Sequence, residues 1–165
     1  MEKRAVDVAI IGAGTAGMVA YQRVRKATDR VVLIEGDQYG TTCARVGCMP
    51  SKLLIAAAEN AHQMQLGDLF GVSAGAIRVD GKRVMERVRT ERDRFVSGVI
   101  NSVEKFPEAH RLRGHARFVG PNHLVVGNNL EVQAGRIIIA TGSRPNIPGF
   151  LKEAKDRLVV NDDIF

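Results

Sequence analysis

The chain contains little sulfur, since only two cysteines occur among its 165 residues. Two sulfurs do not complete a tetrahedral zinc site, and the position of His62 matches no zinc module, so we expect no metal centre. No apolar run approaches the roughly 18 residues that cross a bilayer, and the N-terminus lacks a signal-peptide cleavage pattern. We therefore expect a cytoplasmic protein that does not bind membranes, and in that compartment a disulfide is seldom structural.

Aromatic residues are also scarce, with two tyrosines and no tryptophan, while the formal net charge is +6. The basic residues are spread along the chain without interleaved aromatics, which argues against a nucleic-acid interface. The densest basic stretch, residues 81–94, also carries Glu86, Glu91 and Asp93, a mixture that is typical of a solvated helix face. We therefore expect no nucleic-acid partner.

Glycine, in contrast, is abundant, with 17 residues. The first of these glycines follow an apolar, β-branched run at residues 6–11, which predicts a buried strand. Helix-forming residues 13–25 and a second apolar run at residues 31–34 complete a strand–helix–strand unit of about thirty residues. This order predicts parallel pairing of the two strands.

The segment GAGTAG at residues 12–17 fits the G-x-G-x-x-G pattern at the point where the first strand meets the helix. Gly12 permits the tight turn, Gly14 lets the backbone approach a pyrophosphate, and Gly17 lets the helix pack on the strand. Glu35, at the end of the second strand, can accept hydrogen bonds from a ribose diol. The sequence thus predicts dinucleotide binding; the alternative is a tight turn with a solvated acid, and the motif alone leaves FAD or NAD(P) open.

The rest of the chain predicts two helices, a small meander and a further strand. Pro50 is suited to the start of a helix over residues 51–65, and Asp80 can cap a second helix that runs to about residue 105. Short runs separated by turn residues predict antiparallel strands at 111–119, 123–126 and 130–133, and another apolar strand follows at 136–140. The expected fold class is α/β: a Rossmann-like parallel sheet with a small antiparallel meander.

Both cysteines, Cys43 and Cys48, stand in one short segment. Five residues apart in a helix, their Cα atoms would be separated by about 8.6 Å. A disulfide needs roughly 4.4–6.8 Å, so the segment must leave helical geometry if the bond forms, and Gly47 provides that freedom. A strained, easily opened bond suits a catalytic pair; two reduced, inert cysteines are the alternative.

Taken together, GAGTAG, Glu35, CARVGCMPSK at 43–52 and IIIATGSRPNIPG at 137–149 resemble the FAD-dependent pyridine nucleotide–disulfide oxidoreductases. The resemblance implies that residues 1–150 are the first, incomplete part of an FAD-binding domain. Residues 151–165 would begin a linker toward an NAD-binding domain. Alone, the chain is expected to be inactive.

The resemblance also assigns roles to single residues. Cys43 would be the thiol that meets the substrate and Cys48 the thiol beside the flavin, while Lys52 would lie near the flavin ring. Besides Lys52, the residues that would contact FAD are Gly12, Gly14, Thr15, Ala16, Gly17, Glu35, Thr42, Cys43, Ala116, Thr141 and Gly142.

The implied activity is transfer of electrons from a dithiol, through the cysteine pair and FAD, to NAD+. Dihydrolipoamide is the substrate favoured by the resemblance, with a homodimeric enzyme that can join a 2-oxo acid dehydrogenase complex. Thr41, Ala44 and Arg45 depart from the usual residues around the first cysteine, which puts the substrate in doubt. A glutathione or mercuric reductase type of enzyme, a reductase whose cysteines are bystanders and a non-catalytic nucleotide-binding module are the alternatives.

Overall fold

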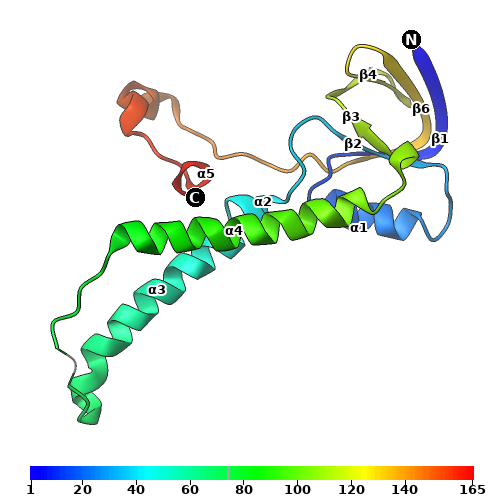
Figure 1. Ribbon diagram of the computed structural model, residues 1–165. Helices are drawn as coiled ribbons and strands as arrows, with labels where there is room; N and C mark the ends of the chain where they lie inside the picture. Colours follow the sequence, from blue (N-terminus) through cyan, green and yellow to red (C-terminus); the bar gives the residue numbers. More distant parts are fainter. Residues whose placement is uncertain (74) are drawn as a thin grey trace. The chain divides into compact units, whose positions relative to one another are not determined.

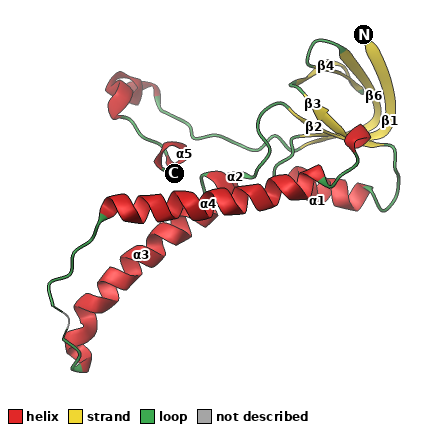
Figure 2. Cartoon of the chain, in the orientation of Figure 1, coloured by secondary structure: helices red, strands yellow, loops and turns green. Residues whose placement is uncertain are grey.

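The computed structural model describes residues 1–73 and 75–165, and the chain divides into two compact units. The first unit comprises Met1–Thr41 and Ser97–Arg144, and the second comprises Thr42–Val96 and Pro145–Phe165. Every strand that the described residues form belongs to the first unit (Figure 2). The domain boundary that we placed at residue 150 stays a prediction.

The first unit is built on one six-stranded sheet with the order β3-β2-β1-β6-β5-β4; Figure 1 labels β1, β2, β3, β4 and β6 of this sheet. Strands β1, β2, β3 and β6 pair in parallel, whereas β4, β5 and β6 pair in antiparallel fashion. The strands are β1 (Glu2–Ile11), β2 (Val31–Glu35), β3 (Arg111–Arg113), β4 (Ala116–Gly120), β5 (His123–Val126) and β6 (Leu130–Ile139). The expected class, a parallel sheet with a small antiparallel meander, is confirmed.

Two strand predictions were wrong in detail. The run at residues 111–119 divides at Gly114, whose φ of +140° is a left-handed value that interrupts a strand. Its first part, β3, joins β2 in parallel, and only its second part enters the meander. The runs at 130–133 and 136–140 form one strand, β6, which pairs with β1 along its whole length while its first part also pairs with β5.

The alternation of side chains along β1 changes between Val6 and Val8. The N–H groups of Asp7 and Val8 both donate to the carbonyl of Arg30, at 2.8 and 3.2 Å. The register between β1 and β6 is the same before and after this point, so neither strand has one residue more than the other. Val6 packs in one hydrophobic cluster and Val8, two residues later, packs in the other, so these two side chains lie on opposite faces of the sheet.

Each face of the sheet has its own hydrophobic core. On one face, residues of β1–β3 pack with residues of the meander, namely Val6, Ala9, Val32, Ile34, Leu112, Leu124, Val126, Val132 and Ala134. On the other face, Tyr21 of helix α1 (Thr15–Val24) packs with Ile10, Leu33 and Val103. Burial of each large aliphatic side chain contributes about 1.5–3 kcal/mol, so both cores hold the parallel strands in place.

The second unit is helical. Its elements are α2 (Thr42–Arg45), α3 (Cys48–Leu66), η1 (Gly67–Phe70), the first part of α4 (Gly81–Glu104), η3 (Gly149–Arg157) and α5 (Asn161–Ile164), while η2 (Glu108–His110) belongs to the first unit. The predicted cap of α4 is confirmed, because Asp80 Oδ1 accepts the N–H of Arg83 at 3.1 Å. Within the described residues, no helix is both long and apolar enough to cross a bilayer.

Candidate functional site

The glycine-rich turn closes against the end of β6 in the first unit. Gly12 has φ +103°, and a Cβ there would lie 2.3 Å from the carbonyl oxygen of Ala140. A Cβ on Gly17 would lie 1.8 Å from the carbonyl oxygen of Gly12, whereas a Cβ on Gly14 would meet nothing within 4 Å. Close backbone contacts therefore exclude any side chain at Gly12 and Gly17. Gly14 instead faces open space that a ligand can fill.

Helix α1, which the structure describes in full, begins without a side-chain cap. Gly14 is its N-cap residue, and no acidic residue stands in the first turn. Thr15 and Ala16 are exposed at this end. Because the first N–H groups of a helix have no partner within it, this terminus can bind an anion. The geometry therefore suits the pyrophosphate that the sequence predicts.

Glu35 stands beside this turn with its carboxylate oriented by two backbone groups. Its Oε2 accepts the N–H of Ala13 at 2.7 Å, and its Oε1 accepts the N–H of Asp37 at 2.9 Å. Each carboxylate oxygen has two acceptor positions, so one on each oxygen remains for hydroxyl donors. Glu35 can therefore hold the glycine turn and still accept a ribose diol.

The carboxyl ends of β1, β2 and β6 lie at one edge of the sheet, because these strands are parallel neighbours. Thr141 and Gly142 follow β6 at this edge, and both are exposed. In the sheet, β2 is the neighbour of β1 on one side and β6 is its neighbour on the other. The carboxyl end of β1 is therefore a topological switch point, where ligands bind in open α/β sheets. We call the 12–17 turn, Glu35, Thr141 and Gly142 the nucleotide cradle.

Ala116 is tied to the same edge through its neighbours. The N–H of Gly114 donates to the carbonyl of Glu35 at 2.9 Å, and the N–H of Gly127 donates to the carbonyl of His115 at 3.0 Å. Ala116 then begins β4 opposite Val126. The structure thus brings Ala116 near Glu35, 81 positions earlier in the sequence, as a shared adenosine site requires.

The cysteines belong to the second unit, at the junction of two helices. Cys43 lies in α2, and Cys48 is the first residue of α3. Gly47 separates them with non-helical dihedrals of φ −123° and ψ −115°, and a Cβ there would lie 3.0 Å from the carbonyl oxygen of Thr42. The segment leaves helical geometry at the glycine, as a pair that can form a bond requires.

The two free thiols face each other. A hydrogen bond with the side chain of Cys48 raises the pKa of the Cys43 thiol, and burial and the neighbouring sulfur raise it further. The backbone N–H groups of Cys48 and Met49 act in the opposite direction, because they donate to the Cys43 sulfur and stabilise its thiolate. The amides that begin α3 therefore stabilise the thiolate of Cys43.

Thr42 and Lys52 flank the pair. Lys52 follows Cys48 by four residues, so it lies on the same face of α3 one turn later, and its side chain is exposed. Thr42 is exposed at the start of α2, and its carbonyl accepts the N–H of Val46 at 3.0 Å. The proximity of these residues to a flavin ring, and of the thiols to the nucleotide cradle, stays a prediction.

Sequence reasoning missed several contacts of histidines. His110 Nδ1 lies 2.8 Å from the hydroxyl of buried Tyr21. Burial, with the positive charges of Arg25 and Arg4, lowers the pKa of His110. The ring of His115 lies against Gly36. These partners are 89 and 79 positions apart, so no local pattern could have revealed them.

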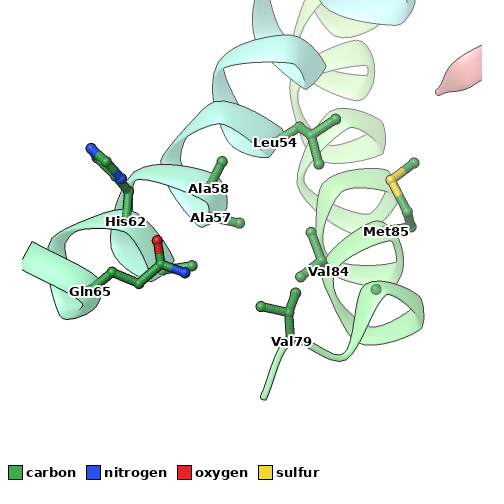
Figure 3. A pocket seen from close by; sticks show the side chains of 10 residues that line it. Leu54, Ala57, Ala58, His62, Gln65, Val79, Val84 and Met85 are labelled. Carbon is green, nitrogen blue, oxygen red and sulfur yellow. The ribbon is translucent and has the colours of Figure 1, made fainter. Parts of the chain in front are cut away.

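An apolar cavity of about 450 Å3 lies between α3 and the start of α4 in the second unit (Figure 3). Its polar side chains are His62 and Gln65, both exposed on α3. Across the described part of the chain, no three metal-ligating side chains gather. The described residues that line this cavity include no thiol and no carboxylate.

A nucleotide cradle on a parallel sheet and a separate pair of facing thiols define the class of flavoprotein disulfide oxidoreductases. The sequence matches the family "Pyridine nucleotide-disulphide oxidoreductase" over residues 6–163, and the chain belongs to this family. The relatives that it matches include oxidoreductases, in agreement with the family that the motifs indicated.

Individual relatives refine this assignment. The chain is 30% identical to dihydrolipoyl dehydrogenase of Bacillus subtilis over 94% of its own length and 35% of the relative. It is 36% identical to mercuric reductase of Shewanella putrefaciens over 86% of its length and 26% of the relative. The solved HOCl-induced flavoprotein disulfide reductase RclA of Escherichia coli covers 87% of this chain and 29% of its own, at 27% identity and a TM-score of 0.65. The chain thus spans about a third of the length of these relatives.

Proposed function

We propose that this chain is the N-terminal FAD-binding part of a dihydrolipoamide dehydrogenase, which oxidises dihydrolipoamide and reduces NAD+. The observation that carries the proposal is the facing pair of Cys43 and Cys48 at a helix break, in a chain that also has a nucleotide cradle. The similarity to several dihydrolipoyl dehydrogenases supports the choice of substrate.

The proposed chemistry is thiol–disulfide exchange. With the cysteines oxidised, a substrate thiolate attacks Cys43 Sγ, a mixed disulfide forms, and Cys48 leaves as a thiolate. The second substrate thiolate then attacks the substrate sulfur of the mixed disulfide, which releases a cyclic disulfide and leaves Cys43 reduced. Two electrons and the matching protons have then moved from substrate to protein. The N–H groups of Cys48 and Met49 stabilise negative charge on Cys43 when it leaves.

The residues of the cradle fit an FAD molecule. The open space at Gly14 and the uncapped start of α1 suit its pyrophosphate, and Glu35 has free acceptor positions for its ribose. When bound, FAD supplies an acceptor for the electron pair of the reduced cysteines. Lys52, on the same face of α3 as Cys48, would place a positive charge near the flavin ring.

Because the chain spans about a third of its relatives, the complete reaction is proposed for the full-length protein. That protein would bind NAD+ in a further domain and form a homodimer. It would work in the cytoplasm, where a 2-oxo acid dehydrogenase complex can supply its substrate. The alternative is a protein that binds a nucleotide without catalysis, and the activity of the full-length protein, measured in the next experiment, distinguishes the two.

The test replaces Cys48 by Ser in the full-length protein. We expect dithiol-dependent formation of NADH to be lost, since Cys43 has no partner to close the disulfide. After mild oxidation, peptide mapping should show that neither cysteine of the wild type reacts with an alkylating reagent, because both are in the disulfide. In the variant, Cys43 should still be alkylated. Met49→Leu, which keeps the backbone amide, is the control and should retain activity. Survival of NADH formation in the variant would refute the proposal.

A second candidate is reduction of a thiophilic metal ion. It is suggested by the match to a mercuric reductase at 36% identity, equal to the identity with the dihydrolipoyl dehydrogenase of Halobacterium salinarum, and by two facing thiols that suit a soft ion. Comparing kcat/KM for dihydrolipoamide oxidation with that for Hg2+ reduction decides between them. A value for Hg2+ far above that for the dithiol would favour this second candidate.

A further inference from the structure

The imidazole of His115 lies directly against Gly36, the residue that follows Glu35. A Cβ built on Gly36 would lie 2.3, 2.7 and 2.9 Å from Nδ1, Cε1 and Cγ of this ring. Three ring atoms so close to one point mean that the ring covers the position where a side chain would stand. Any residue larger than glycine at position 36 would displace the ring.

The backbone on both sides of His115 is held in place. The N–H of Gly114 donates to the carbonyl of Glu35 at 2.9 Å, and the carbonyl of His115 accepts the N–H of Gly127 at 3.0 Å. Gly114 has φ +140°, and a Cβ there would lie 3.0 Å from the backbone nitrogen of Gly127. The position of the imidazole beside the cradle is therefore set by backbone hydrogen bonds and by two glycines.

The rest of the ring is open. His115 is exposed although part of its ring lies against Gly36. The nearby Arg113 guanidinium lies 4.6 Å from the centre of the Tyr39 ring, so that arginine is already stacked on an aromatic side chain. His115 therefore offers a flat, accessible surface beside Glu35 and directly before Ala116.

We propose that the imidazole of His115, seated on Gly36, is the stacking surface for the adenine ring of the bound dinucleotide. The proposal rests on the proposed function in one respect, that the cradle binds an adenosine diphosphate group. Glu35 would hold the ribose, and the ring beside it would cover one face of the base. The φ of Gly36 lies outside the left-handed region, so its backbone conformation does not require glycine. The space that the imidazole occupies is then the reason for a glycine at this position.

The experiment measures the affinity of the flavin-free full-length protein for ADP and for inorganic pyrophosphate by titration calorimetry. Stacking of a base on an aromatic ring contributes about 1–3 kcal/mol, so His115→Ala should weaken ADP binding about 5- to 150-fold. Pyrophosphate, which has no base, should bind within about twofold of the wild type. His115→Phe should restore ADP binding, and His123→Ala, in the meander, should leave it unchanged.

A double-mutant cycle tests the role of Gly36. Gly36→Ala should weaken ADP binding in the wild-type background, because its methyl group displaces the ring. It should have no further effect in the His115→Ala background, since the ring is gone. Equal effects of Gly36→Ala in both backgrounds would overturn the proposal, as would unchanged ADP binding in His115→Ala or an equal loss for pyrophosphate. If the wild type binds pyrophosphate but not ADP or FAD, the proposed function fails as well.

Discussion

Replacement of Gly17 by alanine tests the packing of the glycine turn. The added Cβ would lie 1.8 Å from the carbonyl oxygen of Gly12 and 2.9 Å from its carbonyl carbon. Both are backbone atoms, so the clash cannot be relieved by rotating a side chain, and α1 must move away from β1. Overpacking of this kind costs about 1–3 kcal/mol, and a backbone clash belongs at the upper end of that range.

The matched control is Gly98→Ala, which makes the same change inside a helix without a clash. A Cβ on Gly98, within α4, would meet nothing within 4 Å. Since alanine is the better helix former by about 1 kcal/mol, this variant should be more stable than the wild type. The two substitutions therefore have opposite expected signs, and the free energies of unfolding should differ by roughly 3–4 kcal/mol.

Urea denaturation followed by circular dichroism measures both variants. With a slope of about 1–3 kcal/mol per molar urea, Gly17→Ala should lower the midpoint by about 1–3 M, and Gly98→Ala should raise it slightly. Binding of ADP should weaken only in Gly17→Ala, because the first turn of α1 is displaced. If Gly17→Ala were as stable as the wild type, the steric role that we give to this glycine would be refuted.

Two further predictions concern His110 and Asp80. Because burial and neighbouring arginines lower the pKa of His110 from its ordinary 6.5, the unfolded chain binds more protons, so stability from this residue is full above about pH 6.5 and is lost as the pH falls. Urea midpoints between pH 8 and 5 should show this loss, and His110→Gln should flatten it; an unchanged slope would contradict the assignment. Asp80→Ala should cost about 1 kcal/mol in urea unfolding through loss of the α4 cap, whereas Asp80→Asn should cost less; equal losses would argue against capping.

The sequence by itself determined the features that depend on near neighbours. The glycine turn between β1 and α1, the cap at Asp80 and the helix break at Gly47 are local, since the residues that produce each of them lie within a few positions. Steric limits on φ and ψ, and unpaired N–H groups at helix ends, act over this short range. The family motifs are short for the same reason, so the class of chemistry could be inferred before the fold was seen.

Only the tertiary structure decided which distant segments meet. The run at 111–119 joins two different parts of the sheet because Gly114 turns the chain and β2 offers a free edge. The contacts of His110 with Tyr21 and of His115 with Gly36 likewise join segments far apart in sequence. Strand pairing and side-chain packing depend on the whole sheet, and apolar patterns along one segment do not specify a partner. Local motifs therefore indicated the family, whereas the contacts that surround the nucleotide cradle depend on the fold of the first unit.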